Sequence, residues 1–187
     1  VREADIPIRI KNTFRPEDEG TEIVPTSRHT YSGRRVTGVA GKKNFTVIFL
    51  EKSLMNAEIG FTYRVLAVFL KHGISFEHIP TGIDTMSFVV DSAILKNGVL
   101  EEVCAEIQEN VRPDNLRIIN DIALIAVVGH GMARSVGTSA RLFEAIARAG
   151  VNVRMIDQGS SELNIIVGVD NENYERTLKA VYEEFFE

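Results

Sequence analysis

The sequence contains an internal repeat at a spacing of 77 residues. Glycines, one arginine and one methionine recur in register across it, and the apolar positions between them keep the same spacing. The matched pairs are Gly60 and Gly137, Arg64 and Arg141, Gly73 and Gly150, Gly82 and Gly159, and Met55 and Met132. A repeat of this kind predicts two copies of one supersecondary unit, so the fold must be one that this unit can form twice.

The first copy, residues 44–120, alternates between strand-like and helix-like patterns. Residues 44–50 are rich in β-branched and aromatic side chains, which favours a strand. Apolar residues recur at helical spacing in 61–72 and 99–111, and Gly73 follows the first of these helices as a cap. Further strands are predicted at 74–79, 86–90 and 116–119. The order β-α-β-β-α-β is that of the ferredoxin-like α+β unit, in which both helices cover one face of an antiparallel sheet.

The second copy follows the same order but stops before its last strand. Its predicted elements are a strand at 122–128, a glycine loop at 129–137, a helix at 138–149, strands at 151–156 and 163–169, and a helix at 173–186. An open sheet edge invites wrong pairing, so proteins usually cover it. The isolated β-branched segment 35–41 is the candidate for this role. The first copy is then inserted in the second, which comprises 35–43 plus 121–187.

Residues 1–34 lie outside the repeat. Ile6, Ile8 and Ile10 alternate as in a short strand, whereas 15–35 shows no periodicity and contains prolines and glycines. A long irregular stretch of this kind is uncommon inside a compact domain, so we interpret it as a linker or arm that leaves another domain. The chain starts with valine instead of methionine, and we therefore expect a fragment of a longer protein.

Charge and hydropathy exclude several classes of partner. The net charge is −5 and the pI is near 5.5, which gives no electrostatic reason to expect nucleic acid or an anionic membrane surface. One basic cluster, interpreted as a solvated linker, consists of Arg28, His29, Arg34 and Arg35. No apolar run approaches the roughly 18 residues that a transmembrane helix needs.

Reactive side chains are few. The single cysteine, Cys104, cannot form an internal disulfide and lies on an apolar helix face, which indicates a buried structural thiol in a reduced, cytoplasmic protein. The four histidines have no cysteine or carboxylate at metal-ligand spacing, so no metal site is predicted. No nucleophile elbow, phosphate loop or pair of catalytic carboxylates can be placed. The sequence reads as a binding module.

The loop before the first helix of each copy is the candidate binding site. N–H groups at a helix N-terminus, together with the helix dipole, favour an anion. In the first copy this loop is 53–61, and we expect Glu77 and Asp84 to lie at or near the same end of the sheet. A carboxylate held by N–H groups and an ammonium held by an acid are what recognition of a free amino acid requires.

Structural interpretations of the same residues remain open. In the second copy the corresponding loop is 129–137, and the polar turn after it supplies Gln158, Ser160, Ser161 and Glu162. The loop glycines Gly129, Gly131 and Gly137 could serve only to turn the chain. Glu77 and Asp84 could be solvated surface acids, which is what most carboxylates are.

Three sequence segments resemble a known family. VGHGM at 128–132 and GVNVRMIDQGSSELNI at 150–165 resemble the second of the paired ACT domains of aspartate kinases. GISFEHIPTGIDTMS at 73–87 resembles the first ACT domain of one bacterial branch, and IPIRIKNTF at 6–14 resembles the last strand of the kinase catalytic domain. The resemblance implies the end of a kinase domain and a linker arm at 1–34, a first ACT domain at 44–120, and a second at 35–43 plus 121–187.

This resemblance implies allosteric regulation. Aspartate kinases phosphorylate L-aspartate to 4-phospho-L-aspartate with ATP at the start of lysine, threonine and methionine biosynthesis, and end products inhibit them through the ACT domains. The catalytic core that binds ATP and Mg is not in this chain, so we expect the chain alone to be inactive and to hold no cofactor. A homodimer formed through the ACT domains is implied, with lysine, threonine or both as the effector.

The resemblance also implies site residues. In lysine-binding members the effector lies between the first ACT domains of two subunits. Carried over by position, the effector set is Met55, Glu58, Gly60, Phe61, Thr62, Ser75, Phe76, Glu77, Thr81, Gly82, Ile83 and Asp84. Packing between ACT units is implied for Gln158, Gly159, Ser160, Ser161 and Glu162. Two alternatives remain open: a dimerisation scaffold without an effector site, and a freestanding amino-acid sensor.

Overall fold

The computed structural model describes residues 1, 3–25 and 35–187. Contacts divide the chain into an N-terminal part, Val1–Arg34, and a main body, Arg35–Glu187, which are described separately. Most of the basic cluster, namely Arg28, His29 and Arg34, lies outside the described residues. Arg35 belongs to the main body, where its Nη1 donates a hydrogen bond to the Val136 carbonyl at 3.2 Å.

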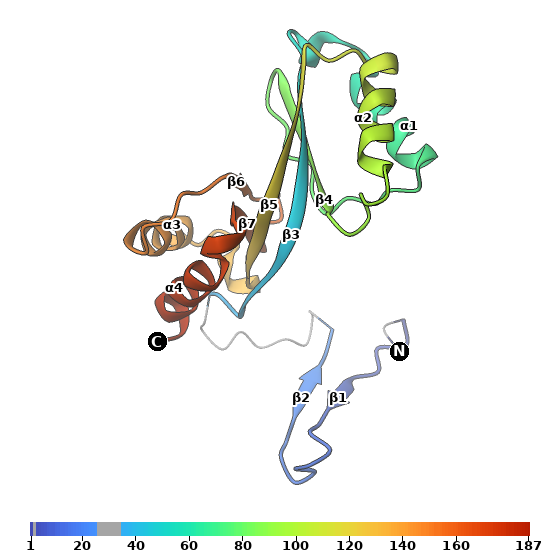
Figure 1. Cartoon of the computed structure of the whole chain (residues 1–187). Helices are drawn as coiled ribbons and strands as arrows, with labels where there is room; N and C mark the ends of the chain where they lie inside the picture. The colour runs from blue at the N-terminus through green and yellow to red at the C-terminus, as the bar shows by residue number, and fades with distance from the viewer. Residues whose placement is uncertain (2, 26–34) are drawn as a thin grey trace. The chain divides into compact units, whose positions relative to one another are not determined.

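The N-terminal part contains a two-stranded antiparallel hairpin (Figure 1). Strand β1, Ile8–Ile10, pairs with β2, Thr21–Ile23, so that Ile8 lies opposite Ile23. The first strand matches the alternation of isoleucines. The second lies in the stretch for which no regular structure is predicted, and that prediction is wrong for residues 21–23. A strand of three residues is too short for an alternation of apolar and polar side chains to be recognised in the sequence.

The main body is a five-stranded antiparallel sheet with helices packed on it (Figure 1). The strand order is β4-β3-β5-β7-β6. The strands are β3 Gly38–Glu51, β4 Thr85–Asp91, β5 Asn115–Val128, β6 Met155–Asp157 and β7 Asn164–Asp170. The helices are α1 Phe61–Lys71, α2 Val99–Asn110, α3 Thr138–Arg148 and α4 Tyr174–Phe186, with single 3₁₀ turns η2 Met55–Ala57, η3 His130–Met132 and η4 Asn171–Asn173. Each predicted helix is present and ends within about one residue of its predicted limits.

Strands β3 and β5 each run through both copies of the repeat. Residues 38–42 pair with 124–128 in the second copy, and residues 47–51 pair with 115–119 in the first. The segment before the first copy therefore completes the sheet of the second, as the open edge requires. The prediction of separate strands at 35–41 and 44–50, and at 116–119 and 122–128, is wrong because each pair forms one continuous strand.

Bulges in these two strands explain why the sequence pattern breaks there. The β3–β5 register shifts on both sides of Phe45. Asn44 and Asp121 have positive φ values of 69° and 59°, which only a local irregularity accommodates in a strand. The Asn44 N–H donates to Asn171 Oδ1 at 3.1 Å, and the Asn171 side-chain amide donates back to Asn44 Oδ1 at 2.9 Å. Each strand therefore has one extra residue at this place. As a result, the core-facing side chains of both copies lie on the same face of the paired strands, and the helices of both copies cover that face.

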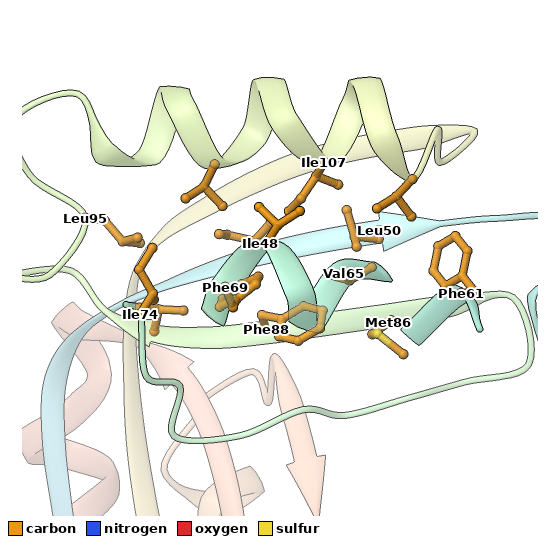
Figure 2. Packing of buried hydrophobic residues seen from close by; sticks show 14 of the residues in the cluster. Ile48, Leu50, Phe61, Val65, Phe69, Ile74, Met86, Phe88, Leu95 and Ile107 are labelled. Carbon is orange, nitrogen blue, oxygen red and sulfur yellow. The ribbon is translucent and has the colours of Figure 1, made fainter. Parts of the chain in front are cut away.

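An apolar core lies between the sheet and the helices in each copy. The first core, shown in Figure 2, includes Ile48, Leu50, Phe61, Val65, Phe69, Phe88, Val103 and Ile107. The second includes Ala123, Ile125, Val127, Leu142, Ile146, Val167 and Val181. A third cluster, formed by Phe45, Val47, Val89 and Ile122, alternates with these along the strands and so lies on the other face of the sheet.

The stripe of buried residues on α2 leaves Cys104 at its border. Val103 and Ile107 are fully buried, whereas Cys104 is half-buried. The prediction of a buried thiol is therefore wrong in degree, because the core-facing positions are one residue before and three after it. Burial, and secondarily the Glu101 carboxylate, raise the pKa of the Cys104 thiol.

Candidate functional site

The loop before α1 leaves the helix start without a side-chain cap. The loop contains η2 and ends at Gly60, whose φ of 82° is left-handed and suits a glycine. No side chain of the described residues caps α1. The first turn of a helix has N–H groups without intrahelical partners, and the helix dipole is positive there. This arrangement suits a carboxylate.

Asp84 joins this loop to the turn at 81–84. Its Oδ1 accepts a hydrogen bond from the Leu54 N–H at 2.9 Å, and its backbone carbonyl accepts one from the Lys52 N–H at 2.8 Å. The Gly82 N–H donates to the Thr85 carbonyl at 2.7 Å, which closes the turn. The structure therefore brings 53–62 and 81–84 together at one end of the sheet.

The site residues predicted in this loop differ in whether their side chains are exposed. Met55 and Phe61 are buried in the first core, so their side chains do not line the loop surface. Thr62 is exposed. Glu58 forms an ion pair with Arg64, which also lies over the ring of Phe61 at 5.9 Å.

Residues 74–79 do not form the predicted strand. They form only an isolated bridge from His78 to Val89, with a second bridge from Thr81 to Met86 beyond them. The Glu77 N–H donates to the Val89 carbonyl at 2.9 Å. Pro80 has no N–H to donate, so regular pairing with β4 cannot continue through it.

Ser75, Phe76 and Glu77 are therefore separated from the helix start. The two bridges are three residues apart along β4, which places Glu77 roughly 10 Å from the turn at 81–84 along the strand direction. Phe76 packs edge-on against Phe69 and Phe88. Glu77 instead lines a cavity of about 300 Å³ on the other face of the sheet, together with Lys42. The structure groups Asp84, but not Glu77, with the loop.

Asp114 is a loop anchor that the sequence did not single out. Its Oδ2 accepts a hydrogen bond from the Ser53 N–H at 2.7 Å, and Lys52 Nζ lies 3.3 Å from Oδ1. The hydrogen bonds from Ser53, and then that from Lys52, hold the pKa of the Asp114 carboxyl below its usual value. An aspartate after a proline at a strand start is too common to indicate this role.

Asp114→Asn is expected to reduce the pH dependence of stability. Because the folded-state pKa of Asp114 is lowered, its ionised carboxylate stabilises the fold fully at pH values above the unfolded-state pKa of about 3.9. This stabilisation is lost as the pH falls through the folded-state pKa. The difference between the urea midpoints of the parent chain and the variant should be largest at pH 7 and should shrink as the pH falls below about 3.9. Glu172→Gln, which replaces an exposed acid of the second copy, is the control. A constant difference across this range would contradict the assignment.

In the second copy, the polar turn 158–162 docks on the corresponding loop of the same chain. The Glu162 N–H donates to the Gly159 carbonyl at 3.0 Å, and Glu162 Oε2 accepts from the Arg134 N–H at 2.6 Å. Gln158, Gly159, Ser160 and Ser161 are exposed. The Glu162 carboxylate therefore fixes the turn against η3, and the remaining turn residues are free to contact another surface.

The described part of the chain contains neither a candidate metal cluster nor a membrane-spanning helix. No group of three or more histidine, cysteine or acidic residues there could hold a metal ion. None of its helices has the length and apolar character required to span a membrane.

Comparisons with known proteins match nearly the whole chain. The ACT domain family model matches residues 125–185. Aspartokinase 3 of Bacillus subtilis is 39% identical over 183 residues, which covers 98% of this chain and 40% of that enzyme. The crystal structure of Clostridium acetobutylicum aspartate kinase is 43% identical, with a TM-score of 0.93 over 98% of this chain and 42% of that one.

A third comparison extends the likeness of fold. E. coli aspartokinase III in complex with lysine and aspartate has a TM-score of 0.76 at 23% identity, covering 99% of this chain and 40% of that one. The chain thus spans about two fifths of the length of the aspartokinases it matches. The chain therefore belongs to the aspartokinase family and corresponds to the regulatory region of those enzymes, which carries the ACT domains.

Proposed function

We propose that this region senses an end-product amino acid and inhibits an aspartate kinase that phosphorylates L-aspartate with ATP. ATP and Mg belong to the catalytic part of the parent enzyme, which we place in the cytoplasm. The observation that carries the proposal is the joining of 53–62 to 81–84 by Asp84 at an uncapped helix start. Support for the ligand class comes from the lysine complex of E. coli aspartokinase III.

The chemistry of the loop suits an α-amino acid. Backbone N–H groups of the first turn of α1 would hold the α-carboxylate, where the helix dipole is favourable. Asp84 uses Oδ1 for the Leu54 N–H, and its charge remains to attract an ammonium group. Lysine and threonine are the two effectors to be compared.

A homodimer completes the proposed site. Leu54, Ile59 and Ile83 surround the loop and are 72%, 97% and 70% exposed in the single chain. Large apolar side chains gathered at one place indicate an interaction surface. We place the first copy of a second subunit there, so that the effector binds between two chains.

Asp84→Asn is expected to weaken effector binding at least about tenfold without unfolding the chain. An asparagine Oδ1 still accepts from the Leu54 N–H, so the loop stays in place, but a charge-assisted interaction worth about 1.5–3 kcal/mol is lost. Titration calorimetry with L-lysine and with L-threonine measures the effect. Asp121→Asn, at an exposed acid whose positive φ asparagine tolerates, is the matched control.

The same titration distinguishes the sensor from a dimerisation scaffold. The exposed apolar side chains around the loop also suit a dimer that binds nothing. A folded dimer that gives no heat with either amino acid favours the scaffold. Heat of binding that is unchanged in Asp84→Asn removes the proposed site while leaving a sensor function in place.

A further inference from the structure

We propose that His78 and Asp157 form a latch between the two copies of the repeat, and that the latch positions 74–81 of the first copy against β6 of the second. His78 lies on the segment that leads to the turn at 81–84, and Asp157 ends β6 immediately before the polar turn 158–162. The latch rests on the proposed function, because it would transmit the effect of an effector bound at the first copy to the second copy.

The imidazole of His78 carries the inference. Its side chain is 11% exposed, and its Nε2 is the one buried side-chain nitrogen or oxygen without a hydrogen-bond partner among the described residues. Asp157 Oδ2 lies 3.4 Å from this nitrogen, close enough for charge attraction but not aligned as a hydrogen bond. Buried polar groups are almost always paired, so a small movement that brings these two atoms into hydrogen-bonding geometry is favoured.

Both partners lie on short elements with few backbone pairs to the rest of the sheet. The His78 segment is held to β4 by the Glu77 N–H to the Val89 carbonyl and by the Val89 N–H to the His78 carbonyl, at 2.9 and 3.0 Å. Strand β6 has only three residues and lies at the edge of the sheet, paired with β7.

The repeat shows that packing does not demand a histidine at this position. His78 corresponds to Met155 in the second copy, and Met155 packs against the third cluster as an apolar side chain. A thioether fills the equivalent place without any polar partner. The imidazole nitrogen therefore has a role other than filling space, and the carboxylate facing it identifies that role.

The other charged groups near the latch are Lys42, which is paired with Asp91, and Glu77. Lys42 on β3 holds Asp91 at 2.7 Å, and Glu77 is adjacent to His78 in the chain. Lys42, Glu77 and His78 line one cavity, whose floor is apolar and includes Leu124, Ala126 and Ile166. Substitutions at His78 and Asp157 leave the Lys42–Asp91 pair in place.

A double-mutant cycle tests the latch without any ligand. We expect the double variant His78→Gln, Asp157→Asn to unfold at the urea midpoint of the more affected single variant, because each substitution removes the same interaction. His72→Gln combined with Asp157→Asn is the control, since His72 contacts Glu106 within the first copy at 2.9 Å. Additive effects of His78→Gln and Asp157→Asn would overturn the latch.

Hydrogen exchange with L-lysine tests the coupling. In the parent chain, we expect lysine to slow exchange in both 53–62 and 153–158. His78→Gln and Asp157→Asn should keep the first effect, lose the second, and bind lysine about fivefold or more weakly, the lower range of allosteric coupling. Lysine binding that leaves 153–158 unchanged in the parent chain would overturn the coupling. Absence of binding of both L-lysine and L-threonine would count against the proposed function, and the cycle above would still decide the latch.

Discussion

Replacing Phe88 by alanine should lower the free energy of unfolding by about 3–5 kcal/mol. Phe88 is fully buried in the first core and is stacked on Phe69 (Figure 2), with ring centroids 4.5 Å apart. It also packs edge-on against Phe76, with ring centroids 5.8 Å apart. Alanine leaves a cavity lined by these rings, and the aromatic contacts are lost in addition to the buried apolar area. Urea unfolding followed by circular dichroism measures the change.

The same experiment reports whether the two copies unfold together. Because β3 and β5 pass through both copies, we expect Phe88→Ala in the first and Leu142→Ala in the second to shift one common transition. Leu70→Ala, at a residue of α1 that is 81% exposed, is the control and should change stability by less than about 0.5 kcal/mol. Two separate transitions in either core variant would contradict the shared-strand interpretation.

Gly129→Ala should destabilise the second copy by about 1–3 kcal/mol or more. A Cβ at this position would lie 2.1 Å from the Arg35 carbonyl oxygen and 2.9 Å from the Val36 Cα. Both are backbone atoms, so no side-chain rotation relieves the clash. The segment that must move is the entry to β3, where the Thr37 N–H donates to the Val128 carbonyl at 2.8 Å.

Gly159→Ala is the matched control for this prediction. Gly159 lies in the polar turn of the same copy, and a Cβ there would meet no atom within 4 Å. Thermal unfolding of both variants should show a clear loss for Gly129→Ala and little change for Gly159→Ala. Equal effects would mean that loop flexibility, and not the close approach to Arg35, decides the need for glycine.

The repeat made most of the fold predictable. Helix limits follow from apolar spacing and from glycines such as Gly73, which are local properties of the chain. Pairing of the segment before the first copy with β5 followed from counting unpaired edges. The continuity of β3 and β5 was not predictable, because the bulges at Asn44 and Asp121 interrupt the alternation of apolar side chains along each strand. The bonds between Asn44 and Asn171 join residues far apart in the chain, which no local pattern shows.

The candidate site was less accessible to sequence reasoning. The loop before α1 could be placed from Gly60 and the helix pattern. That Asp84 uses Oδ1 to hold Leu54, while Glu77 lines a cavity on the other face, depends on how the 74–81 segment lies against β4. The anchoring by Asp114 joins residues far apart in the chain, and no local pattern records such a bond.

The shared strands β3 and β5 leave the two copies without a hinge. Domains joined by a flexible linker can rotate as rigid bodies, whereas here the connection is a pair of hydrogen-bonded strands, each 14 residues long. Reorientation of one copy against the other must therefore occur as torsion along this ribbon, which β-strands accommodate through variable twist. The bulges at Asn44 and Asp121 interrupt the regular pairing of this ribbon, so we expect the torsion to concentrate there.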